Sequence, residues 1–353
     1  MSYKDGWAAL HLQMPAKIPR TEYSVLQHWP LISAVAGRKV DALSPAPARE
    51  AAQKAFLKAW DVSFWWNTWL DSGNYFKGRT TDMGHANYQA GGTDFRDTLR
   101  CPFKTVEDVL AFDPVAEYGI PDRGAIVRSM NQRYREACDF YGDMVNMSGM
   151  YFTMFSGLIH IFGWEMMLLA GGEDPAGFGR VARRYERWMT HFYEALALCE
   201  APVIMSHDDI VWTSGPVFHP DWYREFIFPA YKRMWRPLLD AGKRLVFTAD
   251  GTYTMFFDDV VAAGAHGLVM EPTNDMALFA RQYGRTHAFI GNADTRILLS
   301  GTRDQIRAEV KRCMDIGRHC LGFFLAVGNH IPANTPVENA QFYNEVYEEL
   351  ATR

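Results

Sequence analysis

Four apolar segments in the last third of the chain each end in an ionisable side chain. These segments span residues 244–250, 266–271, 287–294 and 322–330, and they end at Asp250, Glu271, Asp294 and His330. Runs of Val, Ile, Leu and Phe are typical of strands that are buried on both faces, and segments of helical periodicity separate them. This alternation predicts parallel β/α units, in which the carboxyl ends of the strands lie at the same end of the sheet. We therefore expect the four ionisable side chains to lie close together.

Length and composition limit the class of protein. A chain of 353 residues without a linker or low-complexity tract is predicted to form one domain over residues 1–353. A net charge of −5 and a pI near 6.1 do not favour nucleic-acid binding. No apolar run approaches the ~20 residues that cross a bilayer, and the N-terminus lacks the apolar core of a secretory signal. The lack of such a run predicts no membrane partner. Because the five cysteines form no CxxC pair, we expect reduced thiols in a cytoplasmic protein.

The first two thirds of the chain continue the alternation of strands and helices. Strands are predicted at residues 19–25, 150–155 and 202–209. Helices are predicted at residues 47–60, 122–142, 160–169, 177–198 and 221–241. We expect Pro229 to kink or divide the last of these helices. Two further helices are predicted to begin at capping boxes, which span residues 105–108 and 302–305.

Several motifs occur in an order found in one known superfamily. They are Thr81-Asp82-Met83 in an early loop, then Phe247-Thr-Ala-Asp-Gly251, Gly291-Asn292 and Gly328-Asn-His-Ile-Pro-Ala-Asn-Thr-Pro-Val-Glu-Asn339. In this order they resemble the uroporphyrinogen decarboxylase superfamily, which also contains cobamide-dependent methyltransferases. The resemblance spans roughly residues 19–350, and it implies a single (β/α)8 TIM barrel with an N-terminal extension.

Departures from these motifs distinguish the branches of the superfamily. Uroporphyrinogen decarboxylases hold the carboxylates of their substrate with arginines of an N-terminal segment, and here only Arg20 and Arg79 are placed to serve. Asp82 matches the central aspartate of the decarboxylases, which keeps decarboxylation of a pyrrole or tetrapyrrole acid as an alternative. Methyltransferases that act on small thiols have cysteines where this chain has Asp250 and Asn329. The resemblance therefore does not imply a thiolate zinc site.

A third branch demethylates aromatic methyl ethers and passes the methyl group to a corrinoid protein. This chain resembles that branch in its Gly-Asn-His-Ile-Pro segment, and the resemblance implies a zinc site formed by Asp294, Glu309 and His330. Glu309 falls inside the helix predicted after the apolar segment at residues 287–294, so a solvated helix carboxylate is its alternative role. Asp250 and Glu271 are further candidate ligands, and the same set would also suit a harder cation bound through oxygens.

Other polar residues are candidates for catalysis. His207 and Asp209 lie at the end of the strand predicted at residues 202–209, where either would supply another metal ligand or a general acid. In the alternative, an aspartate at this position caps the following turn. Asp82 and His85 lie in the early loop, and both a substrate contact and an exposed loop position are compatible with the sequence of that loop.

Aromatic residues make up 14% of the chain and predict either core packing or an aromatic-lined mouth for a flat substrate. The candidate substrate-binding residues are Arg20, Trp65, Trp66, Trp69, Tyr88, Trp212 and Asn329.

The favoured hypothesis is a methyltransferase of the O-demethylase type. It would cleave a methyl ether with metal activation of the ether oxygen, zinc being the expected metal, and pass the methyl group to the cobalt of a partner corrinoid protein. Metal-free decarboxylation is the rival reaction, and a barrel that binds an aromatic or tetrapyrrole ligand without catalysis is a third hypothesis. The sequence leaves the oligomeric state open, and a homodimer is compatible with it.

Overall fold

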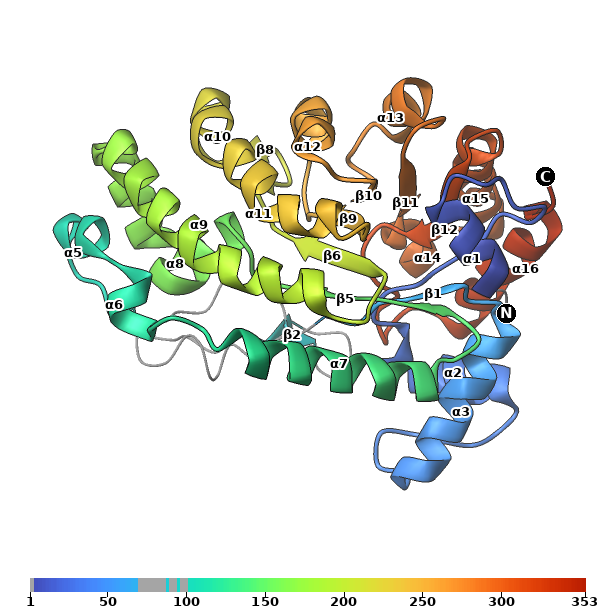
Figure 1. Ribbon diagram of the computed structural model, residues 1–353. Coiled ribbons are helices and arrows are strands. Elements are labelled where there is room, and N and C mark those ends of the chain that lie inside the picture. Colours follow the sequence, from blue (N-terminus) through green and yellow to red (C-terminus); the bar gives the residue numbers. More distant parts are fainter. Residues whose placement is uncertain (1–2, 69–86, 89–93, 96–100) are drawn as a thin grey trace.

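The computed structural model describes residues 3–68, 87–88, 94–95 and 101–353 (Figure 1). Six of its strands form one parallel sheet, in the order β5, β6, β9, β10, β11 and β12. Their bounds are Ser148–Met150, Val203–His207, Arg244–Thr248, Gly267–Met270, Ala288–Ala293 and Gly322–Val327. Each pair of neighbours in this sheet is parallel, as the alternation of strands and helices predicts.

The N-terminal segments close this sheet into a ring. Strand β4 (Val145–Asn146) directly precedes β5 and pairs in parallel with β1 (Phe64–Trp65). Arg20 forms parallel bridges to Val62 on one side and to Leu325 of β12 on the other. The described residues thus supply eight parallel strand segments in a closed order, which confirms the predicted (β/α)8 barrel.

Helices surround the barrel (Figure 1). In the first half of the chain they are α1 (Tyr3–Leu10), α2 (Trp29–Ala36), α3 (Ala46–Ala59), α5 (Val106–Ala111), α6 (Pro114–Tyr118), α7 (Arg123–Phe140) and α8 (Phe155–Glu173). The later helices are α9 (Pro175–Leu198), α10 (Pro220–Phe226), α11 (Phe228–Asp240), α12 (Phe257–Ala263), α13 (Met276–Tyr283), α14 (Thr295–Ser300), α15 (Arg303–Gly317) and α16 (Val337–Leu350). The short elements are the 3-10 turns η1 (Val25–Gln27) and η2 (Thr254–Phe256), with the hairpins β2 (Asn87–Tyr88) to β3 (Asp94–Phe95) and β7 (Val211–Trp212) to β8 (Gly215–Pro216).

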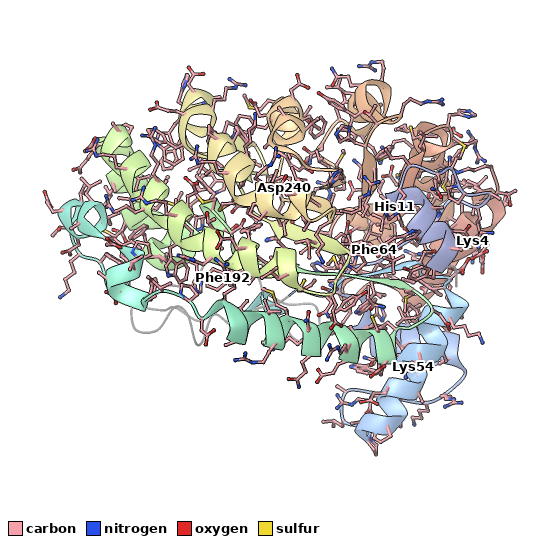
Figure 2. The ribbon with its side chains drawn as sticks, in the orientation of Figure 1. Lys4, His11, Lys54, Phe64, Phe192 and Asp240 are labelled. Atoms are coloured by element: carbon pink, nitrogen blue, oxygen red, sulfur yellow. The ribbon has the colours of Figure 1, made fainter. Side chains whose placement is uncertain are left out.

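Two hydrophobic clusters stabilise the barrel from its inside and its outside. The inner cluster combines inward-facing strand residues, including Phe64 (labelled in Figure 2), with Ala9 and Leu10 of α1. A Cβ atom at Gly322, the first residue of β12, would lie only 2.7 Å from the Ala9 carbonyl oxygen. Helix α1 therefore closes the amino end of the barrel, in keeping with the predicted N-terminal extension. The larger outer cluster lies between the strands and the surrounding helices.

Helix α8 is apolar enough over 18 residues to span a membrane by length and composition alone. Most of this window is buried, and α8 packs against α5 and α9. A core helix of a barrel meets the same criteria, so its composition follows from its packing.

The predicted strand at residues 150–155 is wrong by about one strand length. The strand segment lies at residues 145–150, and α8 already begins at Phe155. Asn146, Ser148 and Gly149 weaken the apolar pattern there. A side chain at Gly149 would collide with the backbone of β6, because its Cβ atom would lie 2.3 Å from the Met205 carbonyl oxygen.

Helix boundaries follow the predictions more closely. Both capping boxes are present, at Thr105–Asp108 and at Thr302–Gln305. The segment predicted at residues 221–241 forms two helices that separate at Ile227, and Pro229 lies in the first turn of α11. Proline divides this segment, as expected, because a first-turn residue needs no amide hydrogen bond.

Candidate functional site

A cavity of about 360 Å³ opens at the carboxyl end of the barrel. Seven of the eight described strand segments contribute residues at or just beyond their ends, namely Glu22, Tyr23, Trp65, Trp66, Tyr151, Met205, His207, Thr248, Asp250, Val269, Gly328 and Asn329. Sites for small molecules commonly occupy this end of such barrels and have volumes of roughly 300–1,000 Å³. This cavity is therefore the candidate active site.

His207, Asp209 and Asp250 form a compact group of potential metal ligands, and no other such group exists among the residues that the structure describes. One ligand atom from each residue lies within 4.8 Å of the other two. His207 Nε2 is 3.3 Å from Asp209 Oδ1. Both side chains are buried, with residue exposures of 4% for His207 and 8% for Asp209. The group combines one imidazole with two carboxylates, a donor set that suits zinc and other divalent ions.

The backbone of Tyr151 orients the imidazole of His207. His207 Nδ1 lies 2.8 Å from the Tyr151 carbonyl oxygen, and the two rings stack with centroids 4.2 Å apart. Because a carbonyl oxygen only accepts, Nδ1 must carry a proton and donate it. In the neutral ring this leaves Nε2 with a lone pair on the side of the carboxylates. A histidine that ligates a metal is commonly fixed in the same way.

The carboxylates of this group destabilise one another. Burial, together with the negative charges of Asp209 and Glu271, raises the pKa of Asp250 well above its usual value. The backbone N–H of Asp250 donates to Asp209 Oδ1 at 2.8 Å, and the N–H of Gly251 donates to Glu271 Oε2 at 2.7 Å. These contacts hold the carboxylates of Asp209, Asp250 and Glu271 close together, where few water molecules can solvate them. A divalent cation would remove the repulsion, so the residues present fit a bound metal.

Asp208 has a different environment from its neighbour Asp209. Its carboxylate accepts hydrogen bonds from the amides of Met154, Phe155 and Ser156, at 3.2, 2.9 and 2.6 Å. The Tyr231 hydroxyl also donates to it. Asp208 therefore binds the amino end of α8, which precedes it in the chain, whereas the sequence had suggested a cap on the following turn.

Exchanging these two adjacent aspartates for alanine should have opposite consequences. Asp208→Ala leaves several buried donors unpaired and should lower the free energy of unfolding by about 3 kcal/mol or more. Asp209→Ala removes one of the carboxylates that repel Asp250, so it should lower the free energy of unfolding by less than Asp208→Ala does, and it should weaken binding of the candidate metal. Urea denaturation and metal analysis of both variants measure this, and an Asp208→Ala protein as stable as the wild type would contradict the assignment.

The structure does not bring the five predicted metal ligands together. Asp250, Glu271, Asp294 and His330 all follow the carboxyl ends of parallel strands, but only Asp250 belongs to the compact group. Glu271, Asp294 and His330 line a neighbouring pocket of about 390 Å³. The candidate ligand set is therefore revised to His207, Asp209 and Asp250.

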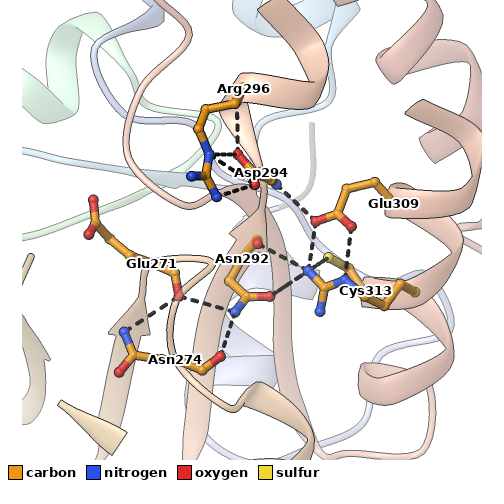
Figure 3. Close-up of polar contacts among 8 residues, drawn as sticks. Glu271, Asn274, Asn292, Asp294, Arg296, Glu309 and Cys313 are labelled. Atoms are coloured by element: carbon orange, nitrogen blue, oxygen red, sulfur yellow. Dashed lines mark hydrogen bonds and ion pairs between the residues drawn. The ribbon is translucent and has the colours of Figure 1, made fainter. Parts of the chain in front are cut away.

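Arginines already neutralise Asp294 and Glu309 (Figure 3). Asp294 caps α14 and pairs with Arg296 at 2.6 Å, and hydrogen bonds from Arg296 lower the pKa of Asp294. Glu309 pairs with Arg312 at 2.7 Å and accepts a hydrogen bond from the backbone N–H of Asp294 at 2.9 Å. Its exposure is 8%, so the alternative role of a solvated helix carboxylate is also wrong. Glu309 instead holds the backbone in place at Asp294, the residue that follows β11.

Asn329 joins the cavity to the neighbouring pocket and lines both. Its Nδ2 donates to Glu271 Oε1 at 3.0 Å, and its Oδ1 lies 2.5 Å from His330 Nδ1. A hydrogen bond from Asn329 also lowers the pKa of Asp250, against the larger effects that raise it. Asn329 thus contacts the side chains around the candidate metal ligands. The role predicted for it from the sequence was a substrate contact.

The predicted aromatic residues have different positions. Trp65 and Trp66 line the cavity, and Trp66 Nε1 donates to Thr21 Oγ1 at 2.8 Å. Trp212 is 50% exposed and stands outside the cavity lining, next to Trp164 with ring centroids 5.3 Å apart. The remaining predicted positions lie outside the residues whose side chains are described, and they are Trp69, Asp82, His85 and Tyr88.

Arg20 does not face the cavity, so its predicted role in substrate binding is wrong. Its side chain is fully buried and pairs with Glu22 at 2.6 Å. The guanidinium lies over the rings of Trp60, Tyr343 and Tyr347, 4.5–5.1 Å from their centroids. These rings belong to the outer core, so Arg20 points away from the barrel interior and stabilises the fold.

Replacing Arg20 should therefore affect stability. Arg20→Met leaves Glu22 as an unpaired buried charge and should lower the free energy of unfolding by about 3–5 kcal/mol. Arg296→Met breaks an arginine–carboxylate pair whose arginine is exposed, and should cost about 1 kcal/mol or less. Chemical denaturation of the two variants checks the difference, and equal losses would show that Arg20 is not buried with its partner.

Two aromatic residues of the cavity wall, Tyr23 and Tyr151, were not predicted from the sequence. Tyr151 follows the third strand segment, and it was hidden because that strand was predicted five residues too late. Tyr23 follows the bridge at Arg20, inside the range predicted as a strand. Its position after the first strand was a usable signal, because strand-end residues form the mouth of a barrel.

Comparisons with known proteins identify the family. The family described as uroporphyrinogen decarboxylase (URO-D) matches residues 98–350, and the chain belongs to this family. It is 25% identical over 178 residues to a uroporphyrinogen decarboxylase of Thermus thermophilus, and the match covers 50% of each chain. It is 29% identical over 128 residues to the enzyme of that name from Syntrophotalea carbinolica, covering 36% of this chain and 37% of the other. The chain thus spans about half the length of the curated relatives it matches, or less.

The resemblance to solved structures extends over the whole chain in at least one case. A methyltransferase from Methanosarcina mazei superposes with a TM-score of 0.66 over 99% of both chains, at 15% sequence identity. At this identity the likeness shows a shared fold. It agrees with the closed barrel described above.

Proposed function

We propose that this protein is a methyltransferase that cleaves the methyl ether of a methoxylated aromatic compound and passes the methyl group to a corrinoid protein. The observation that carries the proposal is the compact group of His207, Asp209 and Asp250, of which His207 and Asp250 line an aromatic-lined cavity. The whole-length likeness to a protein named as a methyltransferase is compatible with it.

An aryl methyl ether reacts slowly because its leaving group, a phenolate, is a strong base. A divalent metal held by His207, Asp209 and Asp250, with zinc as the expected ion, would act as a Lewis acid on the ether oxygen. The chain itself supplies the orientation of that site, since the Tyr151 carbonyl fixes the imidazole. Tyr23, Trp65 and Trp66 offer ring surfaces on which a flat substrate would stack. An opening at the barrel mouth is needed to admit the reduced cobalt of the corrinoid.

Decarboxylation of a pyrrole or tetrapyrrole acid is the second candidate, because the curated relatives bear the name uroporphyrinogen decarboxylase. The charges of the cavity favour the ether. Among the described residues that line it, none is lysine or arginine, whereas Glu22 and Asp250 are acidic. A substrate with several carboxylates requires fixed cations, so this lining suits an uncharged aromatic better.

One assay separates the two candidates. Purified protein, a methoxylated aromatic and a reduced corrinoid protein should yield one phenol for each methyl–cobalt bond formed, as followed by absorbance. Treatment with a chelator should abolish the reaction, and zinc should restore it. Chelated protein that consumes a porphyrinogen would contradict the proposal, and Asp82→Asn should then be the damaging variant.

A further inference from the structure

The Tyr23 hydroxyl is buried and has no hydrogen-bond partner among the described residues. Four buried hydroxyl groups share this property in the described part of the chain, those of Tyr23, Tyr185, Thr248 and Thr335. Tyr23 and Thr248 line the candidate active-site cavity. A buried hydroxyl without a partner costs free energy, and native proteins retain few of them. A ligand that accepts the hydrogen bond would account for the position of Tyr23.

The surroundings of Tyr23 determine what its hydroxyl can do. Burial and the nearby charges of Glu22, Asp250 and Glu271 raise its pKa well above the usual value for tyrosine. The phenol therefore keeps its proton and remains a donor at any ordinary pH. In a cavity lined by acidic groups, an uncharged donor of this kind can contact an electron-rich oxygen of the substrate. Stacking against Trp66, with ring centroids 4.6 Å apart, holds the ring of Tyr23 in place.

We propose that Tyr23 is a catalytic residue that donates a hydrogen bond to the ether oxygen of the substrate. This inference rests on the proposed function. When the carbon–oxygen bond breaks, its electron pair stays on the oxygen, and the pair for the new carbon–cobalt bond comes from the reduced corrinoid. Tyr23 keeps its proton throughout. Its hydrogen bond becomes stronger as the oxygen gains negative charge, and such a change lowers the barrier to reaction.

The variant Tyr23→Phe tests this role, with Tyr185→Phe as its matched control. Each removes one buried hydroxyl that lacks a partner, but Tyr185 lies on α9 and is not part of the cavity lining. Tyr23→Phe should lower kcat by about 100-fold, the loss typical of one donor to a developing oxyanion. Tyr185→Phe should leave kcat unchanged. Neither variant should lower the melting temperature of the ligand-free protein, because no hydrogen bond to a described residue is lost.

Two further readouts separate catalysis from a structural role. The loss in Tyr23→Phe should be smaller for ethers of acidic phenols, such as nitro-substituted ones, because their phenolates need less stabilisation. Calorimetry should also show weaker binding of the phenol product to Tyr23→Phe than to the wild type. An equal loss for all ethers, or full kcat in Tyr23→Phe beside an active wild type, would overturn the role of Tyr23 alone. A wild type that demethylates no methoxylated aromatic would overturn the proposed function and this inference with it.

Discussion

Replacing His207 with alanine is expected to prevent binding of the proposed metal and to lower the rate of the proposed methyl transfer by more than about 100-fold, since even residues that only support a ligand are worth about 10–100-fold. The imidazole is the one nitrogen donor of the group that includes Asp209 and Asp250. Removing it leaves two carboxylates, which hold zinc less tightly. The fold should survive, because the interactions lost, which include the hydrogen bond to the Tyr151 carbonyl, the ring contact with Tyr151 and the contact with Asp209, lie at the rim of the cavity and outside the two hydrophobic clusters.

His330→Ala is the matched control for this experiment. His330 also follows the end of a strand and is partly buried, but it lines the neighbouring pocket and contacts Asn329. The metal content of His330→Ala should equal that of the wild type. Metal analysis after gel filtration measures both variants. Retention of one metal per chain by His207→Ala, with loss in His330→Ala, would restore the ligand set predicted from sequence.

Exchanging Asp250 for asparagine should weaken metal binding and at the same time stabilise the metal-free protein. Asparagine lacks the negative charge that a divalent ion requires, so the affinity should fall by more than about 100-fold. In the metal-free fold, burial and the charges of Asp209 and Glu271 raise the pKa of Asp250 above its value in the unfolded chain. The stability that its neutral form contributes is present below the unfolded pKa, and it is lost as the pH rises through the folded pKa.

The pH dependence of melting checks the sign of this effect. Asparagine resembles the neutral carboxyl at every pH, so metal-free Asp250→Asn should melt higher than the metal-free wild type at neutral and alkaline pH. The two proteins should converge as the pH falls below ~4, because the carboxyl then becomes neutral in the unfolded wild type as well as in the folded one. A metal-free variant that melts lower than the wild type at pH 8 would show that the carboxylates do not repel one another.

Strand polarity made the general location of the site predictable from sequence. Each apolar run ends in a polar residue, and parallel strands bring those ends together, so the positions of Asp250, Glu271 and His330 at one end of the barrel followed from the pattern. The direction of each side chain did not follow from it. Asp208 and Asp209 are neighbours at the end of β6, yet one binds the amino end of α8 and the other faces Asp250. A single residue of register separates a structural role from a functional one.

Ion-pair partners that were overlooked led to other wrong predictions from the sequence, and some of these partners could have been recognised. Asp294 and Glu309 pair with Arg296 and Arg312, which lie two and three residues further along the chain. An arginine at such short range was visible in the sequence, and it favours an ion pair over metal binding. The burial of Arg20 could not be seen in this way. Its aromatic neighbour Tyr343 is more than 300 residues away in sequence, and only the closed barrel brings it close.

Diffraction at the zinc absorption edge, on crystals of protein purified without added chelator, would locate the metal directly. We expect one anomalous peak, bounded by His207 Nε2 and the carboxylates of Asp209 and Asp250, and we expect it to disappear in crystals of His207→Ala. A peak between His330 and Asp294, or the absence of any peak in crystals of protein that still transfers methyl groups, would contradict this expectation.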